Sequence, residues 1–354
     1  MIFTIVKIPW KETPVHSYHV LLLLLITFIP RTIALANGEW KLMRSEDGIR
    51  SYARSIPGSK FLELKAITII DAKMEVVGEV LRDVPSNPQW MANCGEARII
   101  RQLARNDMIV HTVLDFPAPV SDRDLVVKSV TTYLLDRARG IITLSSVVDP
   151  AAPPGSGVVR MTDFAGEYVL EYISREKTGV IYSYRADPGG NLPAFLVNIF
   201  SRDGLYKTLT GLKRMSKRQK YVDAALRSPD RALFDSTLRD REKVRGILRN
   251  RLLERIRDRE TVDYVVRDEE IFRLFVEGDG SITGKIFLSW GSYASVRDSV
   301  KDILRVHLKK YSSNQKAVDA VANDEALVAS IIRGRKAGEP PVMETVKKKL
   351  ASAK

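Results

Sequence analysis

The feature that most constrains this 354-residue chain is a series of short strand-like runs between residues 49 and 185. These runs are rich in β-branched and aromatic residues, and turn sequences such as Arg105-Asn106-Asp107, Asp136–Arg139 and Ala165-Gly166 separate several of them. The predicted strands are Ile49–Arg54, Lys60–Ile70, Ala97–Leu103, Met108–Phe116, Leu125–Leu135, Gly140–Val148, Val158–Asp163, Tyr168–Ser174 and Val180–Arg185. Because tight turns join successive strands, we expect one antiparallel sheet, interrupted after Ile70 by a short helix over Lys73–Val84.

A long amphipathic helix follows the last predicted strand. Its apolar side chains recur at helical spacing: Leu192, Phe195, Leu196, Ile199, Phe200, Leu205, Leu209 and Leu212. A sheet of this size must cover one face, and this helix is the large element available to do so. A curved sheet closed by one helix leaves a space between them. Whether side chains or a ligand fill that space decides the function.

Three ordered motifs within residues 40–217 resemble the START domain family, the steroidogenic-acute-regulatory-related lipid-transfer domains. They are Asp115–Val127 (DFPAPVSDRDLVV), Trp90-Met91 followed by Cys94 and Glu96-Ala97, and Asp187–Pro193 (DPGGNLP) before the long helix. The resemblance implies an α+β helix-grip fold, in which a curved antiparallel sheet wraps a long C-terminal helix around an apolar tunnel. It also implies that one lipid-like molecule binds in that tunnel. Some sterol carriers of the family hold a buried acid–base pair there, whereas this chain has Ser129 near the corresponding point.

Alternation along the strand after the first motif predicts which side chains face the tunnel. Leu125, Val127, Ser129 and Tyr133 share one face, and Lys128 on the other face is expected to meet solvent. From the long helix, Phe195, Leu196, Ile199 and Phe200 are the predicted lining residues. Asp115, Arg123 and Arg185 lie near strand ends and are candidates for contacts with a polar head group. For Arg123 we favour the alternative of a structural ion pair or turn hydrogen bonds that hold the Pro117–Asp122 loop. For Asp115 and Arg185 the alternative is solvation at the sheet edge.

The first 36 residues have the layout of a secretory signal peptide. Lys7 and Lys11 precede an apolar run of ten residues, Val20–Ile29, and Ala34-Leu35-Ala36 supplies a cleavage site. Ten residues are fewer than the roughly 20 that span a bilayer as a helix, so an uncleaved anchor is the weaker alternative. We therefore expect an exported chain, periplasmic or secreted, whose mature form begins after Ala36.

The net charge of +13 is concentrated in the second half of the chain. Residues 211–354 hold 32 basic and 21 acidic side chains, whereas residues 37–210 hold 21 of each. This difference predicts a lipid-binding domain over 37–220, a smaller basic α+β or helical domain over 221–335, and a loose Lys-rich tail over 336–354. Within the second domain, Thr261–Val266, Ile271–Val276 and Ile282–Ser289 are predicted strands, and 292–310 a helix. Its cations either contact anionic lipid head groups or form a solvated face.

Several classes of function lack support in the sequence. Cys94 is the single cysteine and the four histidines are scattered, so neither a disulfide framework nor a metal site is expected. No nucleophile-elbow, phosphate-binding or dinucleotide-binding motif occurs, and the interleaved charges do not indicate a nucleic-acid partner. We therefore expect a lipid carrier without cofactor or catalytic residues. The alternatives are a cyclase or aromatase on the same fold, using Asp115, His111 or Arg185, and a structural protein whose cavity is filled.

Overall fold

The computed structural model describes residues 38–118, 120–190, 192, 194–276, 278, 280–289, 293–335 and 339–352, with the side chains of 194–202, 281–282 and 293–295 excepted. The predicted signal peptide lies outside these residues. Ten strands form one sheet: β1 (Lys41–Glu46), β2 (Ile49–Ser55), β3 (Leu62–Ile70), β4 (Cys94–Ala104), β5 (Asp107–Leu114), β6 (Arg123–Leu134), β7 (Arg139–Ser146), β8 (Val159–Arg160), β9 (Asp163–Ser174) and β10 (Lys177–Asp187).

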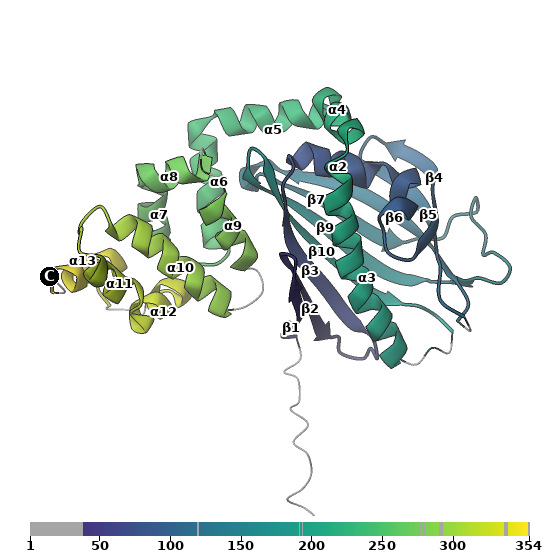
Figure 1. The fold of residues 1–354 in the computed structure, drawn as a ribbon, viewed down its shortest axis with the longest axis horizontal. Helices are drawn as coiled ribbons and strands as arrows, with labels where there is room; N and C mark the ends of the chain where they lie inside the picture. The colour runs from purple at the N-terminus through teal and green to yellow at the C-terminus, as the bar shows by residue number, and fades with distance from the viewer. Residues whose placement is uncertain are drawn as a thin grey trace, which may run out of the picture.

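The strand order is β1-β2-β3-β10-β9-β7-β6-β5-β4, and neighbours along this path are antiparallel. The two-residue β8 adds a parallel pair to β6. Helix α3 (Ala194–Met215) crosses one face of the sheet, and α2 (Met74–Arg82) and the 3₁₀ turn η1 (Val84–Gln89) lie beside it (Figure 1). In the C-terminal half of α3, one apolar face is buried against the sheet. Its side chains are at most 1% exposed: Leu205, Leu209, Leu212 and Met215. This arrangement confirms the predicted antiparallel sheet with a long helix across it.

Two details of the sheet differ from the sequence prediction. The exposed strand β1 was not predicted, because its polar sequence KLMRSE carries little alternation. The turn predicted at Ala165-Gly166 is wrong, since β9 runs through it and Gly166 pairs with Tyr184. A Cβ atom at Gly166 would lie 3.0 Å from the ring of Phe164 and 3.3 Å from Tyr184. Two aromatic neighbours therefore leave little room for a side chain here, and this close packing rather than a turn accounts for the glycine.

All the secondary-structure elements described beyond α3 are helices. Its helices are α4 (Gln219–Arg227), α5 (Pro229–Arg239), α6 (Arg241–Leu253), α7 (Arg259–Arg267), α8 (Glu269–Val276), α9 (Ser281–Leu288), α10 (Tyr293–Leu308), α11 (Gln315–Ala322), α12 (Glu325–Arg333) and α13 (Val342–Ser352). No helix among the described residues is both long enough and apolar enough to cross a membrane.

The three strands predicted in this region are wrong, because Thr261–Val266, Ile271–Val276 and Ile282–Ser289 lie in α7, α8 and, for all but the last residue, α9. The N-caps explain the first two cases. Asp258 accepts a hydrogen bond from the backbone N–H of Thr261, and Asp268 accepts from that of Ile271. Such caps stabilise a helix start by about 1 kcal/mol, which is enough to offset the weak strand preference of a few β-branched residues.

The prediction of a loose tail over 336–354 is also wrong, because residues 342–352 form α13. Helix α13 buries Val342, Met343, Val346 and Leu350 in the core of the helical region. The apolar residues of this helix are spaced by one, three and four positions, a pattern that the many neighbouring lysines obscured.

The boundary predicted after residue 220 does not coincide with a break in packing. Tyr221 and Ala225 of α4 and Phe234 of α5 are buried in the same core as Val80 and Trp90. Figure 1 shows α4 and α5 running over the top of the sheet before the chain enters the remaining helices. The lipid-binding domain predicted over 37–220 therefore shares its core with the two helices that follow it.

A buried ion cluster joins the sheet to α6. Arg139 of β7 contacts Glu171 of β9 at 2.7 Å and Glu254, just after α6, at 2.9 Å. Arg251 of α6 is 1% exposed and donates to the carbonyls of Arg137, Ala138 and Tyr172. Burial alone would raise the pKa of Glu171, but Arg251 and Arg139 hold that pKa below its usual value. The opposite charges of Arg251 and Glu171 thus keep each other ionised in a buried site.

On the opposite face of the sheet from α3, α9 makes a second junction. The ring of Phe287 covers Gly179 of β10, where a Cβ atom would lie 2.7 Å from the ring carbons. Phe287 is completely buried together with Ile67, Ile173 and Ile181. The helical region is therefore packed against the sheet through apolar as well as ionic contacts.

We expect Arg251→Met to lower the free energy of unfolding by about 3–5 kcal/mol, because Glu171 loses one of the guanidinium groups beside it and three buried carbonyls lose a charged donor. Arg249→Met on the same helix is the control, since Arg249 is 40% exposed in its ion pair with Asp263 and should change stability by about 0.5 kcal/mol. Chemical denaturation followed by circular dichroism measures both. Equal losses in the two variants would contradict a stabilising role for the cluster.

Candidate functional site

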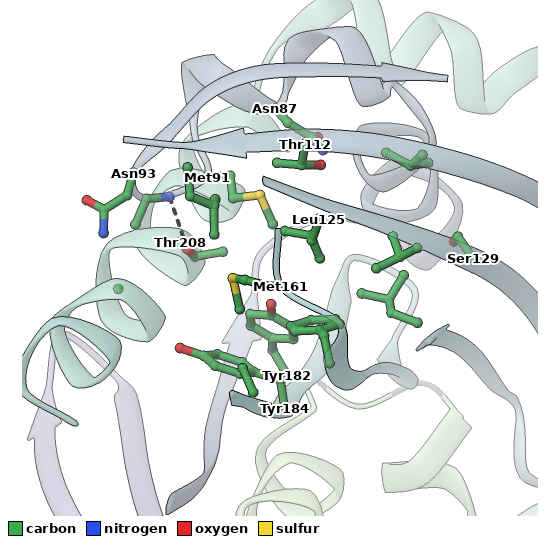
Figure 2. Close-up of a pocket in the computed structure, with 18 of the residues that line it drawn as sticks. Asn87, Met91, Asn93, Thr112, Leu125, Ser129, Met161, Tyr182, Tyr184 and Thr208 are labelled. Atoms are coloured by element: carbon green, nitrogen blue, oxygen red, sulfur yellow. Dashed lines mark hydrogen bonds between the residues drawn. The ribbon is translucent and has the colours of Figure 1, made fainter. Parts of the chain in front are cut away.

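A cavity lies between the concave face of the sheet and the helices α3 and η1. The volume of this cavity is about 180 Å³. Strands β5, β6, β7, β9 and β10 supply most of its wall. Figure 2 shows Asn87 and Thr112 on one side of the cavity, Tyr182 and Tyr184 on the other, and Leu125 and Met161 between them.

Strand alternation determines which side chains form this wall. Leu125, Val127 and Ser129 of β6 line the cavity, whereas Asp124 and Lys128 do not. The hydroxyl of Thr208 on α3 accepts a hydrogen bond from the backbone N–H of Ala92 at 3.1 Å, the bond drawn dashed in Figure 2. Gly211, one turn further along α3, lies so close to the carbonyl of Trp90 that a Cβ atom would collide with it. These two contacts fix α3 against the segment after η1.

The predicted lining residues fall into three groups. Leu125, Val127 and Ser129 lie on the cavity wall. Tyr133 lies further along β6, in a smaller adjoining pocket of about 30 Å³ that shares Leu81, Ser129 and Ile142 with the cavity. The side chains of Phe195, Leu196, Ile199 and Phe200 are outside the described residues.

The adjoining pocket is closed by α5, which lies beyond the predicted lipid-binding domain. Phe234 packs edge-on against Tyr133 with 5.4 Å between ring centroids. Asp230 forms ion pairs with Arg82 of α2 at 3.0 Å and with Arg105 at 3.4 Å. Burial and a hydrogen bond to Asp230 raise the pKa of Tyr133 to about 12. No sequence pattern joined α5 to this site, because the contact depends on how the helices pack.

None of the three predicted head-group residues lines the cavity. Asp115 packs against Gly95, and Arg185 pairs with Asp163 across β9 and β10 at 2.9 Å with both side chains about half exposed. Arg123 is 3% exposed and donates to the carbonyls of Ser121, Pro188 and Gly189. Burial lowers the pKa of the Arg123 guanidinium. Arg123 thus joins the loop before β6 to the turn after β10. This is the structural role that the sequence analysis gave as the alternative to a head-group contact.

The polar residues that do line the cavity were largely missed by the sequence interpretation. They are Asn87, Asn93, Thr112, Tyr168, Tyr182, Tyr184 and Thr208, beside the predicted Ser129. Trp90 also borders the cavity and belongs to a motif that was recognised, but its role as a wall residue was not predicted. No Asp, Glu, His, Lys or Arg is among the described residues of the wall.

Other candidate chemistries receive no support in the described part of the chain. It contains no group of three His, Cys, Asp or Glu side chains placed to hold a metal ion. Cys94 is buried, and burial raises the pKa of its thiol to about 11. His111 and Arg160 both contact Asp124, at 2.9 Å and 2.7 Å, away from the cavity wall. This cluster holds the loop at Ala152, whose carbonyl accepts from Arg160.

Many cations of α6 are engaged within the protein. Arg241 and Arg245 pair with Glu269, and Arg249 pairs with Asp263 at 2.5 Å. The apolar stripe of the same helix is buried in the core of the helical region. These pairs favour the interpretation of α6 as part of a folded, internally paired array.

The first part of the chain is similar to known proteins. A model described as START domain matches residues 30–221. The chain is 30% identical over 182 residues to an uncharacterised protein of Pseudomonas aeruginosa, covering 51% of this chain and 88% of that protein. It is 25% identical over 175 residues to phosphatidylcholine transfer protein of Mus musculus, covering 49% and 81%. A STAR-related lipid transfer protein of Xanthomonas axonopodis, solved as a fragment, is similar with 25% identity, a TM-score of 0.47, and coverage of 51% and 99%.

We expect Arg123→Met to lower the free energy of unfolding by about 2–4 kcal/mol, because three carbonyls lose a charged donor in a buried site. Arg185→Met is the matched control from the same set of predicted residues, and its exposed ion pair should contribute at most about 1 kcal/mol. Thermal and chemical unfolding of the purified variants measures both changes. A stable Arg123→Met protein would contradict the structural role assigned to this guanidinium.

Proposed function

This chain belongs to the START domain family, and from that premise we propose that it binds one lipid-sized apolar molecule in the cavity beneath α3 and acts as a lipid carrier. Family relatives are lipid-transfer proteins, and phosphatidylcholine transfer protein is one of them by name. The observation that carries the proposal is the unfilled, largely apolar space between α3 and five strands.

The physical gain from binding follows from the nature of the wall. Each CH₂ group that leaves water contributes about 0.8 kcal/mol, and a dozen contribute on the order of 10 kcal/mol before the costs of association. Retention of a lipid therefore needs no covalent or ionic bond. The cavity volume also argues against the alternative of a structural protein whose interior is filled by its own side chains.

The alternative of a cyclase or aromatase needs an acid–base group that reaches the ligand. His111, Asp115 and Arg185 were the candidates, and none of them borders the cavity. The described wall offers hydroxyl, amide and indole groups instead, and burial raises the pKa of Tyr182 well above its ordinary value. These groups suit binding without proton transfer, so we propose a carrier rather than an enzyme.

Two further parts of the proposal concern location. We propose that the chain is exported through its N-terminal segment and that it loads lipid at a membrane surface, to which the basic second half is attracted. Protein recovered from fractionated cells should have the mass of a chain beginning at Asn37, and its vesicle binding should weaken with added salt. A full-length mass in the cytoplasmic fraction would contradict export, and salt-independent binding would contradict the electrostatic attraction.

We expect Ser129→Phe to reduce the amount of bound lipid about ten-fold or more, because the ring occupies space that the ligand needs. Ser145→Phe is the control, since Ser145 lies on β7 opposite Lys128 and is exposed. Each full chain is incubated with phospholipid vesicles and re-isolated, and its extractable lipid is measured by mass spectrometry. Circular dichroism checks that both variants fold. Wild-type protein that takes up no lipid, or equal uptake by both variants, would overturn the proposal.

A further inference from the structure

The wall of the cavity combines polar groups with an absence of charge among its described residues. Three cations lie close by, and all three have protein partners. Arg82 pairs with Glu79 and Asp230, Arg123 donates to backbone carbonyls, and Arg160 pairs with Asp124. The fold therefore directs nearby cations away from the ligand space and leaves neutral dipoles facing it.

Two of these dipoles have no hydrogen-bond partner among the protein atoms, namely the side-chain oxygen Oδ1 of Asn87 and the indole Nε1 of Trp90. A third dipole, the phenol of Tyr168, has the phenol of Tyr182 as its protein partner and can take a further one. The residues Asn87, Trp90 and Tyr168 are only 9%, 5% and 3% exposed, and all three line the cavity. A buried polar group that stays unpaired costs about 1–3 kcal/mol, so each of the two unpaired atoms favours a ligand that can pair with it.

The hydrogen-bonding capacity of the three groups is complementary. The indole of Trp90 donates, the Asn87 oxygen accepts, and the Tyr168 hydroxyl can do either. The ring of Tyr168 lies parallel to that of Tyr182, with 4.0 Å between centroids, and burial raises the pKa of both phenols. The tyrosines therefore stay neutral at physiological pH and can serve as donors.

We propose that the cavity selects lipids whose buried polar group is uncharged, such as a hydroxyl, ester or amide, and that Asn87, Trp90 and Tyr168 bind that group. This inference rests on the proposed lipid-binding function and names the class of lipid. A phosphate buried against this wall would meet no cation among the described residues. Burying an unpaired ion costs several kcal/mol even after relaxation, far more than burying a neutral ester with hydrogen bonds.

A competition between lipids tests the selectivity. The full chain is incubated with vesicles of phosphatidylcholine and phosphatidylglycerol that contain diacylglycerol, all three lipids having the same acyl chains. Lipid bound to the re-isolated protein is then quantified by mass spectrometry and compared with the vesicle composition. We expect diacylglycerol to be enriched about ten-fold or more over both phospholipids.

The possible outcomes separate this inference from the proposed function. Uptake in which either phospholipid equals or exceeds diacylglycerol would overturn the selectivity but leave lipid binding intact. Uptake of no lipid from any class would overturn both.

Variants test the assignment of the three atoms. Trp90→Phe and Tyr168→Phe each remove one polar group and keep an aromatic ring, so we expect the preference for diacylglycerol to fall about five- to ten-fold in each. Tyr52→Phe is the control, because Tyr52 is buried at 5% exposure in the core on the opposite face of the sheet. Asn87→Leu adds a third variant should one of the aromatic changes impair folding. An unchanged preference in all three cavity variants would overturn the assignment, since water would then be satisfying these atoms.

Discussion

A ten-stranded antiparallel sheet has a broad concave face, and in this protein one long helix must cover it. Helix α3 closes that face at its C-terminal half, where Leu205, Leu209 and Leu212 pack without any exposed surface. At the level of Gly204 the helix instead borders the cavity. The cavity is thus a consequence of geometry, because the curved surface is larger than the helix that lies across it. Uptake of an apolar guest, as proposed, would lower the free energy of the remaining apolar surface.

The two-residue period of the strands separates charge from the ligand space. Along β6, Leu125, Val127 and Ser129 face the cavity, whereas Asp124 and Lys128 face the other side. The same sorting sends Arg139 and Glu171 into the junction with α6. A one-residue change of register would bring these ions inside. The hydrogen bonds of the sheet fix the register of the strands, and the register keeps charged side chains out of the cavity wall.

Local patterns predicted the parts of the structure that depend on local physics. Strand alternation placed Leu125, Val127 and Ser129 on the inner face, and the apolar spacing after Leu192 identified the covering helix. Prediction failed where distant contacts decide the outcome. Gly166 looked like a turn residue until its aromatic neighbours were known. Asp258 and Asp268 are a different case, because each caps its helix through a backbone N–H three residues away, a local signal that the sequence interpretation overlooked. Asn87 and Tyr168 carry no sequence pattern that marks them as wall residues, because their position depends on the curvature of the whole sheet.

Helix α5 has a consequence for the size of guest that the protein can hold. Phe234 and Asp230 come after the stretch that matches the family model, yet they form the far end of the space that begins at Ser129. An acyl chain extending past Ser129 would stop at these side chains. The stretch that matches the family model thus forms the walls of the cavity, and α5, which follows that stretch, lines the adjoining pocket. Replacement of Phe234 by a smaller side chain would therefore enlarge this space without altering the sheet.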